Sequence, residues 1–327
     1  MKFGSPIKFT PIMKEKVWGG NKLKRLFKKA SLSSKVGESW EISGVEGALS
    51  VVANGEFIGK SIHELIEIFK QDFLGKQVYA KFGNQFPLLF KFIDAKEKLS
   101  IQLHPNDTLA KSRHNSFGKT EMWYIVQADK NANLIIGFKE KFNEKMYQQH
   151  LDNGTLEELL HYEKVKEGDA FYITPGRIHA IGAGVLLAEI QQTSDITYRL
   201  YDWNRPDSDG KLRELHNDLA LDAIDFSVSN EYRLEYHRVT NHPQKLIASP
   251  YFETSFLEVH GKIDRDLSLI DSFVVYMCVA GEGIIRVNTN SQIIQLGETV
   301  LIPAICTKVS ILATNAKLLE VFVPPNQ

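Results

Sequence analysis

The chain has 327 residues, with 39 lysines and arginines against 40 aspartates and glutamates, and its formal net charge is -1. This balance gives no overall field that would attract nucleic acid or an anionic membrane, and it favours a small-molecule substrate. The length suggests about two domains, each able to bury a core of its own.

The N-terminal residues lack the apolar core of a signal peptide, and no later run is long enough to span a membrane. We therefore expect a soluble, cytoplasmic protein. The two cysteines, Cys278 and Cys306, lie in apolar segments at residues 274–279 and 300–306 that are predicted to be strands. We interpret both as buried small hydrophobic side chains, because a domain of this size needs no disulfide.

Strand signals dominate the first two thirds of the sequence. Short apolar or alternating runs, bounded by Gly, Pro, Asn and Asp, are expected to be strands. These runs are residues 50–53, 88–93, 100–104, 122–127, 134–138, 170–174 and 185–192. Such a pattern is typical of a sandwich or barrel, so the predicted fold class is mainly β.

Helices are expected between these strands. Ser61 and Glu64 form a capping-box pattern before an amphipathic segment. A second helical stretch is predicted at residues 143–161, interrupted at Gly154, and a third at residues 213–224. The predicted fold therefore has a few short helices among many strands.

The chain becomes strand-rich again from about residue 232. We expect a boundary at residues 225–240, with a catalytic domain at residues 1–230 that carries helical insertions and an accessory barrel at residues 231–327. A weak internal repeat supports two barrels, because residues 168–175 and 297–303 share a glycine turn, an acidic residue, an apolar strand and a final proline. This pattern is typical of jelly-roll barrels of the cupin type.

The repeat also indicates which barrel is active. His179 follows the proline of the first copy by four residues, and Thr307 occupies the matching position of the second copy. The accessory barrel is therefore expected to lack metal ligands.

Candidate metal ligands cluster in the first barrel. Alternation along a strand places Gln102 and His104 on one face, and the same parity places Lys119 with Glu121 if the strand begins at Lys119. Together with His179 these residues offer imidazole, carboxylate and amide groups, which suit zinc first, although iron, cobalt and manganese stay open. Gln102 is the weakest candidate, because an amide is a poor donor and can instead orient a neighbouring ligand.

Each of these residues also has an interpretation that involves no metal or substrate. A single histidine beside a proline at a strand end is more often a surface or core residue, and only the combination indicates a metal site. The other eight histidines lack such partners and are interpreted as structural or solvated. A polar segment at residues 189–205 contains Arg199, whose forked and permanent charge suits an oxyanion or a phosphate, but such a segment is also compatible with a simple hydrogen-bonded loop.

With these residues in view, the chain resembles the type I mannose-6-phosphate isomerases of the shorter bacterial kind, which belong to the cupin superfamily. The matching stretches are residues 18–20, 37–41, 86–91, 99–105, 118–124, 175–180 and 197–202. Several motifs in the expected order are more specific than any single pattern. Two departures are Thr120, where longer members more often have proline, and the compact region between Glu121 and His179.

The resemblance implies a zinc-dependent interconversion of D-mannose 6-phosphate and D-fructose 6-phosphate through a cis-enediol. One zinc ion per chain is implied, with Gln102, His104, Glu121 and His179 as ligands. The family's active-site arginine carries over to Arg199 and its motif lysine to Lys119, so these two are the expected catalytic residues. The roles of Lys119 stay open between proton transfer and phosphate binding. The implied partner is a phosphosugar, with no nucleic acid and no membrane.

Two alternatives remain at this point. One is a cupin that binds a phosphosugar without converting it, and the other is a metal-dependent oxygenase, because two histidines and one carboxylate are the common ligands of non-haem iron. The positions of Lys119 and Arg199 favour an isomerase, since a phosphosugar enzyme needs cations near the ligand set. The oligomeric state is not determined by the sequence.

Overall fold

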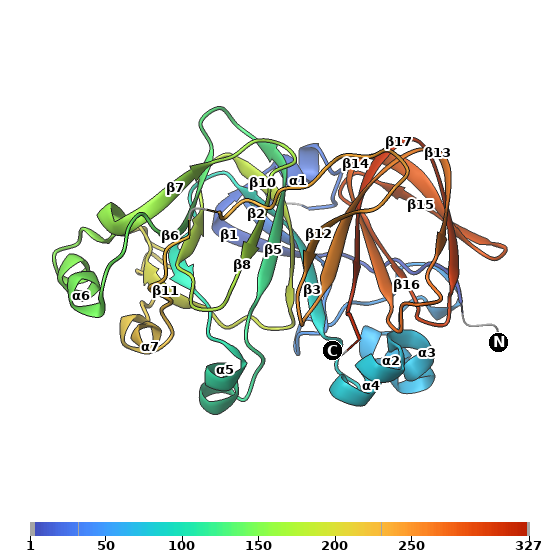
Figure 1. Cartoon of the computed structure of the whole chain (residues 1–327), viewed down its shortest axis with the longest axis horizontal. Coiled ribbons are helices and arrows are strands. Elements are labelled where there is room, and N and C mark those ends of the chain that lie inside the picture. The colour runs from blue at the N-terminus through green and yellow to red at the C-terminus, as the bar shows by residue number, and fades with distance from the viewer. Residues whose placement is uncertain (1–3, 32, 230, 326–327) are drawn as a thin grey trace.

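The computed structural model describes residues 4–31, 33–229 and 231–325. Within these ranges β-strands predominate, as predicted, and they form three sheets (Figure 1). The first sheet has the order β1 (Ile12–Gly20), β2 (Val36–Ile42), β3 (Leu88–Ala95), β10 (Val185–Gln192), β5 (Glu121–Ala128) and β8 (Ala170–Ile173). The second sheet has the order β11 (Tyr198–Tyr201), β4 (Ile101–Leu103), β9 (His179–Ile181), β6 (Asn133–Phe138) and β7 (Leu160–Lys164).

The third sheet contains the C-terminal strands, drawn in orange and red in Figure 1. Its order is β12 (Gln244–Ala248), β13 (Glu253–Asp266), β17 (Lys308–Phe322), β14 (Val274–Val287) and β15 (Asn290–Gln295), and β16 (Thr299–Ile302) pairs with β14. The long strands β13, β14 and β17 close around a hydrophobic cluster of their own, which includes Cys278 and Cys306. Both cysteines are buried and free, as predicted, although Cys306 lies beyond the end of β16.

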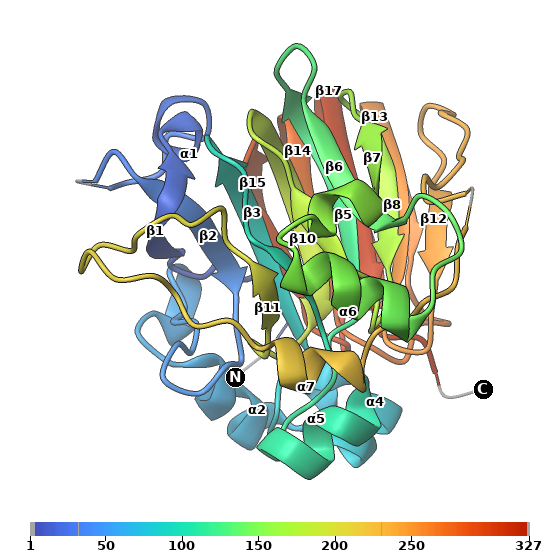
Figure 2. The ribbon, with the colours of Figure 1, turned by 90° about the vertical axis from the view of Figure 1, so that its left-hand side faces the viewer.

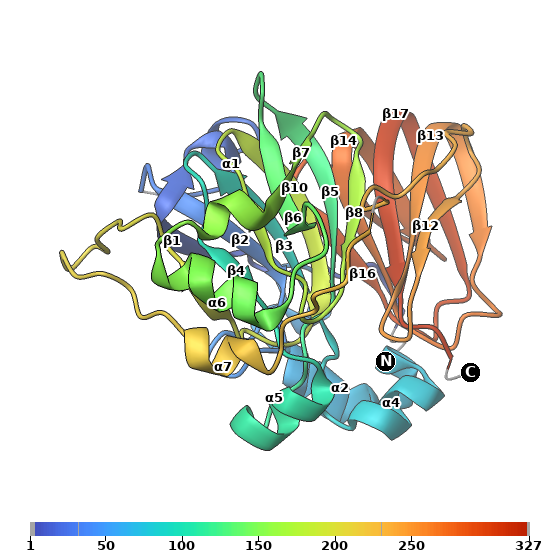
Figure 3. The ribbon, with the colours of Figure 1, turned by 60° about the vertical axis from the view of Figure 1, so that its left-hand side comes forward.

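The first sheet lies between the other two (Figure 3). Alternate residues of its strands enter different hydrophobic clusters, because successive side chains of a strand point to opposite faces. Tyr124 packs in a cluster with Phe256 of the third sheet, whereas Trp123 packs in a cluster with Leu134 of the second sheet. The space between the first and second sheets is where the candidate ligands lie.

The helices occupy the ends and outer faces of these layers. The helices α2 (Ile62–Phe69), α3 (Gln71–Leu74) and α4 (Lys76–Phe82) lie below the third sheet in Figure 1. The predicted capping box is present, with Ser61 and Glu64 exchanging backbone and side-chain hydrogen bonds. On the far side, α6 (Glu144–Asp152) and α7 (Asn217–Leu221) cover the second sheet, as Figure 2 shows, and α5 (Asp107–His114) projects below it. Among the described residues, no helix is long and apolar enough to cross a membrane.

Three predicted elements differ from the structure. Residues 50–53 form only isolated bridges, because Val51 and Val52 pair with different segments. The second helical stretch ends as a short 3-10 helix at Leu156–Leu159, and His161 lies on β7, where pairing with β6 replaces the helix. The third is confined to α7, because the His216 N–H donates to the carbonyl of Arg199 and ties the preceding segment to β11.

The internal repeat has a structural counterpart. Gly168 and Gly297 both have a left-handed backbone, with φ of 87° and 84°. The Gly168 N–H donates to the Ile125 carbonyl, and the Gly297 N–H donates to the Cys278 carbonyl, at 2.9 Å in each case. In both copies the residue after the glycine accepts the N–H of that same partner. The two turns are therefore built by the same hydrogen bonds, before β8 and before β16.

Candidate metal centre and its cavity

The strand pairing of the second sheet brings the candidate ligands together. Gln102 and His179 are register partners on β4 and β9, His104 follows β4 directly, and Glu121 is the first residue of β5. One ligand atom each from His104, Glu121 and His179 lies within 4.8 Å of the other two, and all three side chains are buried. Within the described ranges this is the one such group of His, Cys, Asp or Glu side chains.

Main-chain carbonyls fix the orientation of both imidazoles. His104 Nδ1 lies 2.9 Å from the Ile196 carbonyl oxygen, and His179 Nδ1 lies 2.9 Å from the Arg177 carbonyl oxygen. A carbonyl oxygen only accepts, so Nδ1 carries the proton and Nε2 presents its lone pair. Both Nε2 atoms face Glu121, at 3.3 Å from Oε1 and 3.8 Å from Oε2. This is the arrangement by which a second hydrogen bond prepares a histidine to bind a metal.

Burial keeps both histidines neutral. It lowers the pKa of His104 to about 3, assisted by the nearby charge of Lys119, and it also lowers the pKa of His179. Burial alone raises the pKa of Glu121, but the neighbouring charge of Lys119 opposes it, and that pKa lies well below its usual range. The group therefore consists of two neutral imidazoles and a carboxylate, which is the protonation state that a divalent ion requires.

Lys119 contacts the carboxylate directly. Its Nζ lies 2.9 Å from Glu121 Oε1 and its side chain is buried. The two side chains meet although β5 begins only at Glu121, so the condition on which strand parity predicted this contact is not met.

The donor set fits a divalent metal ion. Among the described residues, His104 Nε2 and Glu121 Oε2 are buried without a hydrogen-bond partner, and Glu121 Oε1 is paired with Lys119 alone by charge. Gln102 stands next to them, with its Nε2 3.5 Å from His179 Nε2 and its Oε1 accepting from Ser100 Oγ at 3.2 Å. Two imidazoles and a carboxylate match the ligand chemistry of zinc and similar ions, and the Gln102 amide lies beside them.

Arg199 reaches the same region from β11, where it is the register partner of Gln102. Its Nη1 donates to the Glu214 carbonyl at 2.9 Å, and its Nε is buried without a partner among the described residues. Burial and the charge of Arg213 lower the pKa of Arg199. A guanidinium with donors to spare in a low-dielectric site is suited to bind an anion.

A cavity of about 140 Å³ adjoins the group, and Gln102, Lys119 and Arg199 all line it. Its other charged lining residues are Lys16, Glu38, Lys91, Glu189, Asp195 and Arg213. Five cations and three carboxylates therefore surround the cavity, apart from the ligand group itself. A small polar molecule that carries negative charge is the occupant this lining favours.

Two of these residues form a buried ion pair that the sequence analysis did not single out. Lys91 Nζ lies 2.8 Å from Glu189 Oε1, and the Trp123 indole N–H donates to Glu189 Oε2 at 2.8 Å. Burial lowers the pKa of Lys91, but Glu189 and Glu38 reverse this, so the net shift is upward. Burial and the charge of Glu121 raise the pKa of Glu189.

A signal for this pair was present in the sequence. Lys91 interrupts the apolar run of β3, and Glu189 interrupts that of β10, and a charge inside a buried strand needs a partner. The pairing became visible only with the register, in which Lys91 and Glu189 are opposite each other.

The family model "Phosphomannose isomerase type I, catalytic domain" matches residues 7–149. The mannose-6-phosphate isomerase ManA of Bacillus subtilis is 37% identical over 281 residues, which are 85% of this chain and 86% of that protein. The mannose-6-phosphate isomerase of Streptococcus mutans is 32% identical over 89% of this chain and 90% of its own length.

The fold is also similar to that of a solved relative. The crystal structure of the mannose 6-phosphate isomerase from Bacillus subtilis superimposes with a TM-score of 0.88 at 32% identity, covering 97% of this chain and 99% of that one. The similarity therefore includes the strands that carry the candidate ligands and the third sheet.

Proposed function

Because the chain belongs to the type I phosphomannose isomerase family, we propose that it interconverts D-mannose 6-phosphate and D-fructose 6-phosphate through a cis-enediol. The observation that carries the proposal is the buried group of His104, Glu121 and His179 beside a cavity lined by Lys119 and Arg199. The buried group supplies the proposed metal site, and the cavity lining supplies the positive charge that a phosphosugar needs.

One zinc ion held by His104, Glu121, His179 and Gln102 is part of the proposal. When bound, a divalent ion supplies Lewis acidity, which polarises an oxygen of the sugar. The carbonyls of Ile196 and Arg177 keep both imidazoles oriented toward the ion position, and Lys119 offsets the charge of the buried carboxylate.

The reaction moves a proton between C1 and C2 of the open-chain sugar, and negative charge develops on the oxygens of the enediol. Arg199 is the residue proposed to stabilise this charge, since its Nε is buried without a partner among the residues described. Lys119 has two candidate roles, as the group that carries the proton or as a point charge that binds the phosphate. Its contact with Glu121 places it at the junction of the metal group and the cavity.

Only the first part of the chain is proposed to carry out the chemistry. Residues 1–230 carry the proposed ligands, and residues 231–327 form an accessory barrel in which Thr307 stands where the first copy has His179. A cytoplasmic location is included, because two buried free cysteines suit a reducing compartment.

The decisive experiment is an anaerobic coupled assay with mannose 6-phosphate, performed together with metal analysis of the same preparation. We expect conversion to fructose 6-phosphate without oxygen and about one zinc per chain. His104→Ala should lose both the metal and the turnover, while His237→Ala, at an exposed histidine of matched chemistry, should lose neither.

Each other outcome has a defined meaning. Binding of mannose 6-phosphate without conversion would support a phosphosugar-binding protein, and a requirement for oxygen would support an oxygenase. Full turnover by a metal-free His104→Ala protein would reject metal catalysis.

A further inference from the structure

The segment between His104 and Glu121 leaves the β-structure and returns to it. It forms α5 and comes back so closely that the Lys119 N–H donates to the Pro105 carbonyl at 3.2 Å. Both ends of this segment therefore lie at the metal group. Contacts at its base, where the two ends meet, also hold the backbone of Lys119.

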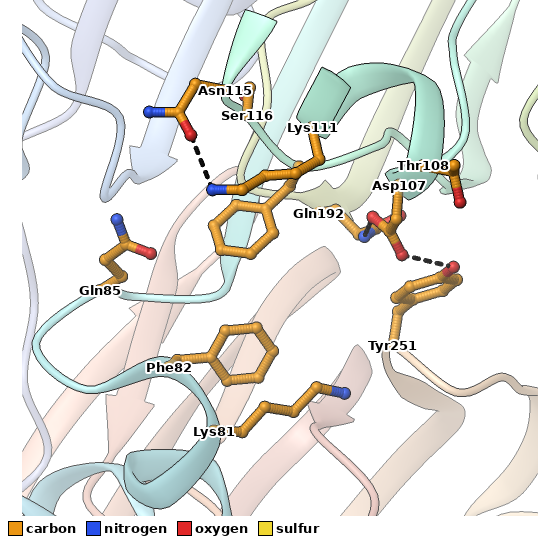
Figure 4. A pocket seen from close by; sticks show the side chains of 11 residues that line it. Lys81, Phe82, Gln85, Asp107, Thr108, Lys111, Asn115, Ser116, Gln192 and Tyr251 are labelled. Carbon is orange, nitrogen blue, oxygen red and sulfur yellow. Dashed lines mark hydrogen bonds between the residues drawn. The ribbon is translucent and has the colours of Figure 1, made fainter. Parts of the chain in front are cut away.

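Asp107 joins three segments at that base. Its Oδ1 accepts the Gly118 N–H at 2.8 Å and the Gln192 amide Nε2 at 3.0 Å. Its Oδ2 accepts the Tyr251 hydroxyl at 3.0 Å. Figure 4 shows the Gln192 and Tyr251 bonds converging on this carboxylate from opposite sides. We call Asp107, Gln192 and Tyr251 the anchor.

Gln192 extends the anchor to the next residue of the segment. Its Oε1 accepts the Thr120 N–H at 2.9 Å, and its own N–H donates to the Thr120 carbonyl at 3.2 Å. A proline at residue 120 would have no N–H to donate, so threonine makes this bond possible. With the Lys119 bond to Pro105, three consecutive amides around Lys119 are fixed.

The fit at the anchor is tight. A Cβ on Gly118 would lie 2.6 Å from the Asp107 backbone nitrogen and 2.7 Å from the Asn106 carbonyl carbon. The close approach of these two backbone segments therefore requires glycine at residue 118, and it leaves little room for the segment to shift.

Tyr251 belongs to the C-terminal part of the chain. It lies between β12 and β13, next to the fully buried Phe252. Burial and the neighbouring carboxylate of Asp107 raise the pKa of Tyr251 to about 12, so the hydroxyl stays a donor at neutral pH. With Asp107 and Gln192 it lines a surface cavity of about 560 Å³, a different cavity from the one beside the metal group.

We propose that Tyr251 is a positioning residue, by which the C-terminal barrel holds Lys119 against Glu121 through Asp107 and the amides of Gly118 and Thr120. The kinetic consequence of this proposal rests on the proposed isomerase function. The structural consequence, slow exchange of those amides, does not.

The test compares Tyr251→Phe with the wild type. The substitution keeps the ring and removes the hydroxyl, so the anchor loses one hydrogen bond. We expect amide hydrogen exchange in a peptide spanning residues 115–121 to quicken about fivefold, the effect of one net hydrogen bond, with zinc content unchanged. We expect kcat/KM for mannose 6-phosphate to fall by a similar factor of about five.

A matched control is Tyr162→Phe, because the Tyr162 hydroxyl also donates to a carboxylate, Glu157, at 3.1 Å but on β7. It should change neither exchange at residues 115–121 nor turnover. A second arm places Tyr251→Phe in a Lys119→Met background. A residue that acts through Lys119 has no further kinetic effect there, whereas general destabilisation would lower kcat/KM again.

Unchanged exchange at residues 115–121 in Tyr251→Phe would overturn the proposal, and so would an equal loss of kcat/KM with and without Lys119. If the wild type did not isomerise mannose 6-phosphate, the proposed function would fail, and the exchange measurement would still decide whether the anchor holds this backbone.

Discussion

Gln102 and His179 are opposite each other on β4 and β9, and their Nε2 atoms lie 3.5 Å apart. Of these two register partners, His179 is the stronger candidate metal ligand and Gln102 is the weaker one. His179 presents a buried lone pair toward Glu121, whereas Gln102 offers an amide whose oxygen already accepts from Ser100.

Removing each of the two side chains should therefore affect metal binding differently. We expect Gln102→Ala to weaken zinc affinity about 10- to 100-fold and still allow loading, because an amide is the weakest of the four proposed ligands. His179→Ala should retain no zinc after gel filtration. Competition with a chromophoric chelator measures both. Equal losses in the two variants would make Gln102 as strong a ligand as His179, and no loss in Gln102→Ala would remove it from the proposed ligand set.

Arg199→Ala separates charge stabilisation from metal binding. We expect turnover of mannose 6-phosphate to fall about 100-fold or more, because one donor to a developing oxyanion is worth that much. Zinc content should stay at the wild-type level. Arg286→Ala, at an exposed arginine on β14, is the control and should keep full activity. Unchanged turnover in Arg199→Ala would reject the role proposed for this residue.

The two roles of Lys119 predict different behaviour for Lys119→Arg. A point charge for the phosphate survives this change, so KM would rise modestly and kcat would be kept. A proton carrier does not survive, because arginine stays protonated, and kcat would fall about 100-fold or more. Lys119→Met should be impaired in either case. Steady-state kinetics of both variants decides, and full activity of Lys119→Met would exclude both roles.

The buried thiol of Cys278 should make the stability of the protein depend on pH. Burial raises the pKa of its thiol to about 12, whereas the unfolded thiol titrates near its ordinary value of about 8.5. The contribution of the buried thiol is complete below the unfolded pKa and is lost as pH rises toward the folded one, at about 1.4 kcal/mol per pH unit. We call the loss in the free energy of unfolding of a variant, relative to the wild type, its stability deficit. The stability deficit of Cys278→Ala should therefore be about 2 kcal/mol smaller at pH 10 than at pH 7.5.

Urea unfolding at the two pH values measures this deficit. Val279→Ala is the control, because it removes a buried neighbour that does not titrate, and its deficit should be the same at both pH values. Equal deficits for Cys278→Ala at both pH values would show that its thiol is not protected in the folded state.

Local patterns predicted much of the metal group. The order of motifs indicated His104 and His179 as partners of Glu121, and the structure brings these residues together. Lys119 also contacts Glu121, but without the strand at residue 119 that the argument from alternation required. The capping box at Ser61 followed from a pattern of four residues. In each case the relevant partner is a few residues away or belongs to a recognisable motif.

The missed features depend on pairing between distant segments. Lys91 and Glu189 are 98 residues apart and meet only through the β3–β10 register. His161 was predicted to be helical because residues 143–161 have helical spacing, but the edge of β6 offered hydrogen bonds that a helix end could not match. Register between strands is a property of the whole sheet, so a single segment carries little information about it.

The acceptors that orient His104 and His179 are the main-chain carbonyls of Ile196 and Arg177. No side-chain substitution at residue 196 or 177 removes a carbonyl, so a scan of point variants at these two positions would leave the imidazole tautomers in place. An insertion or deletion nearby would move the carbonyl itself. The site is therefore expected to tolerate changes of residue type at these positions better than changes in the length of the segments that carry them.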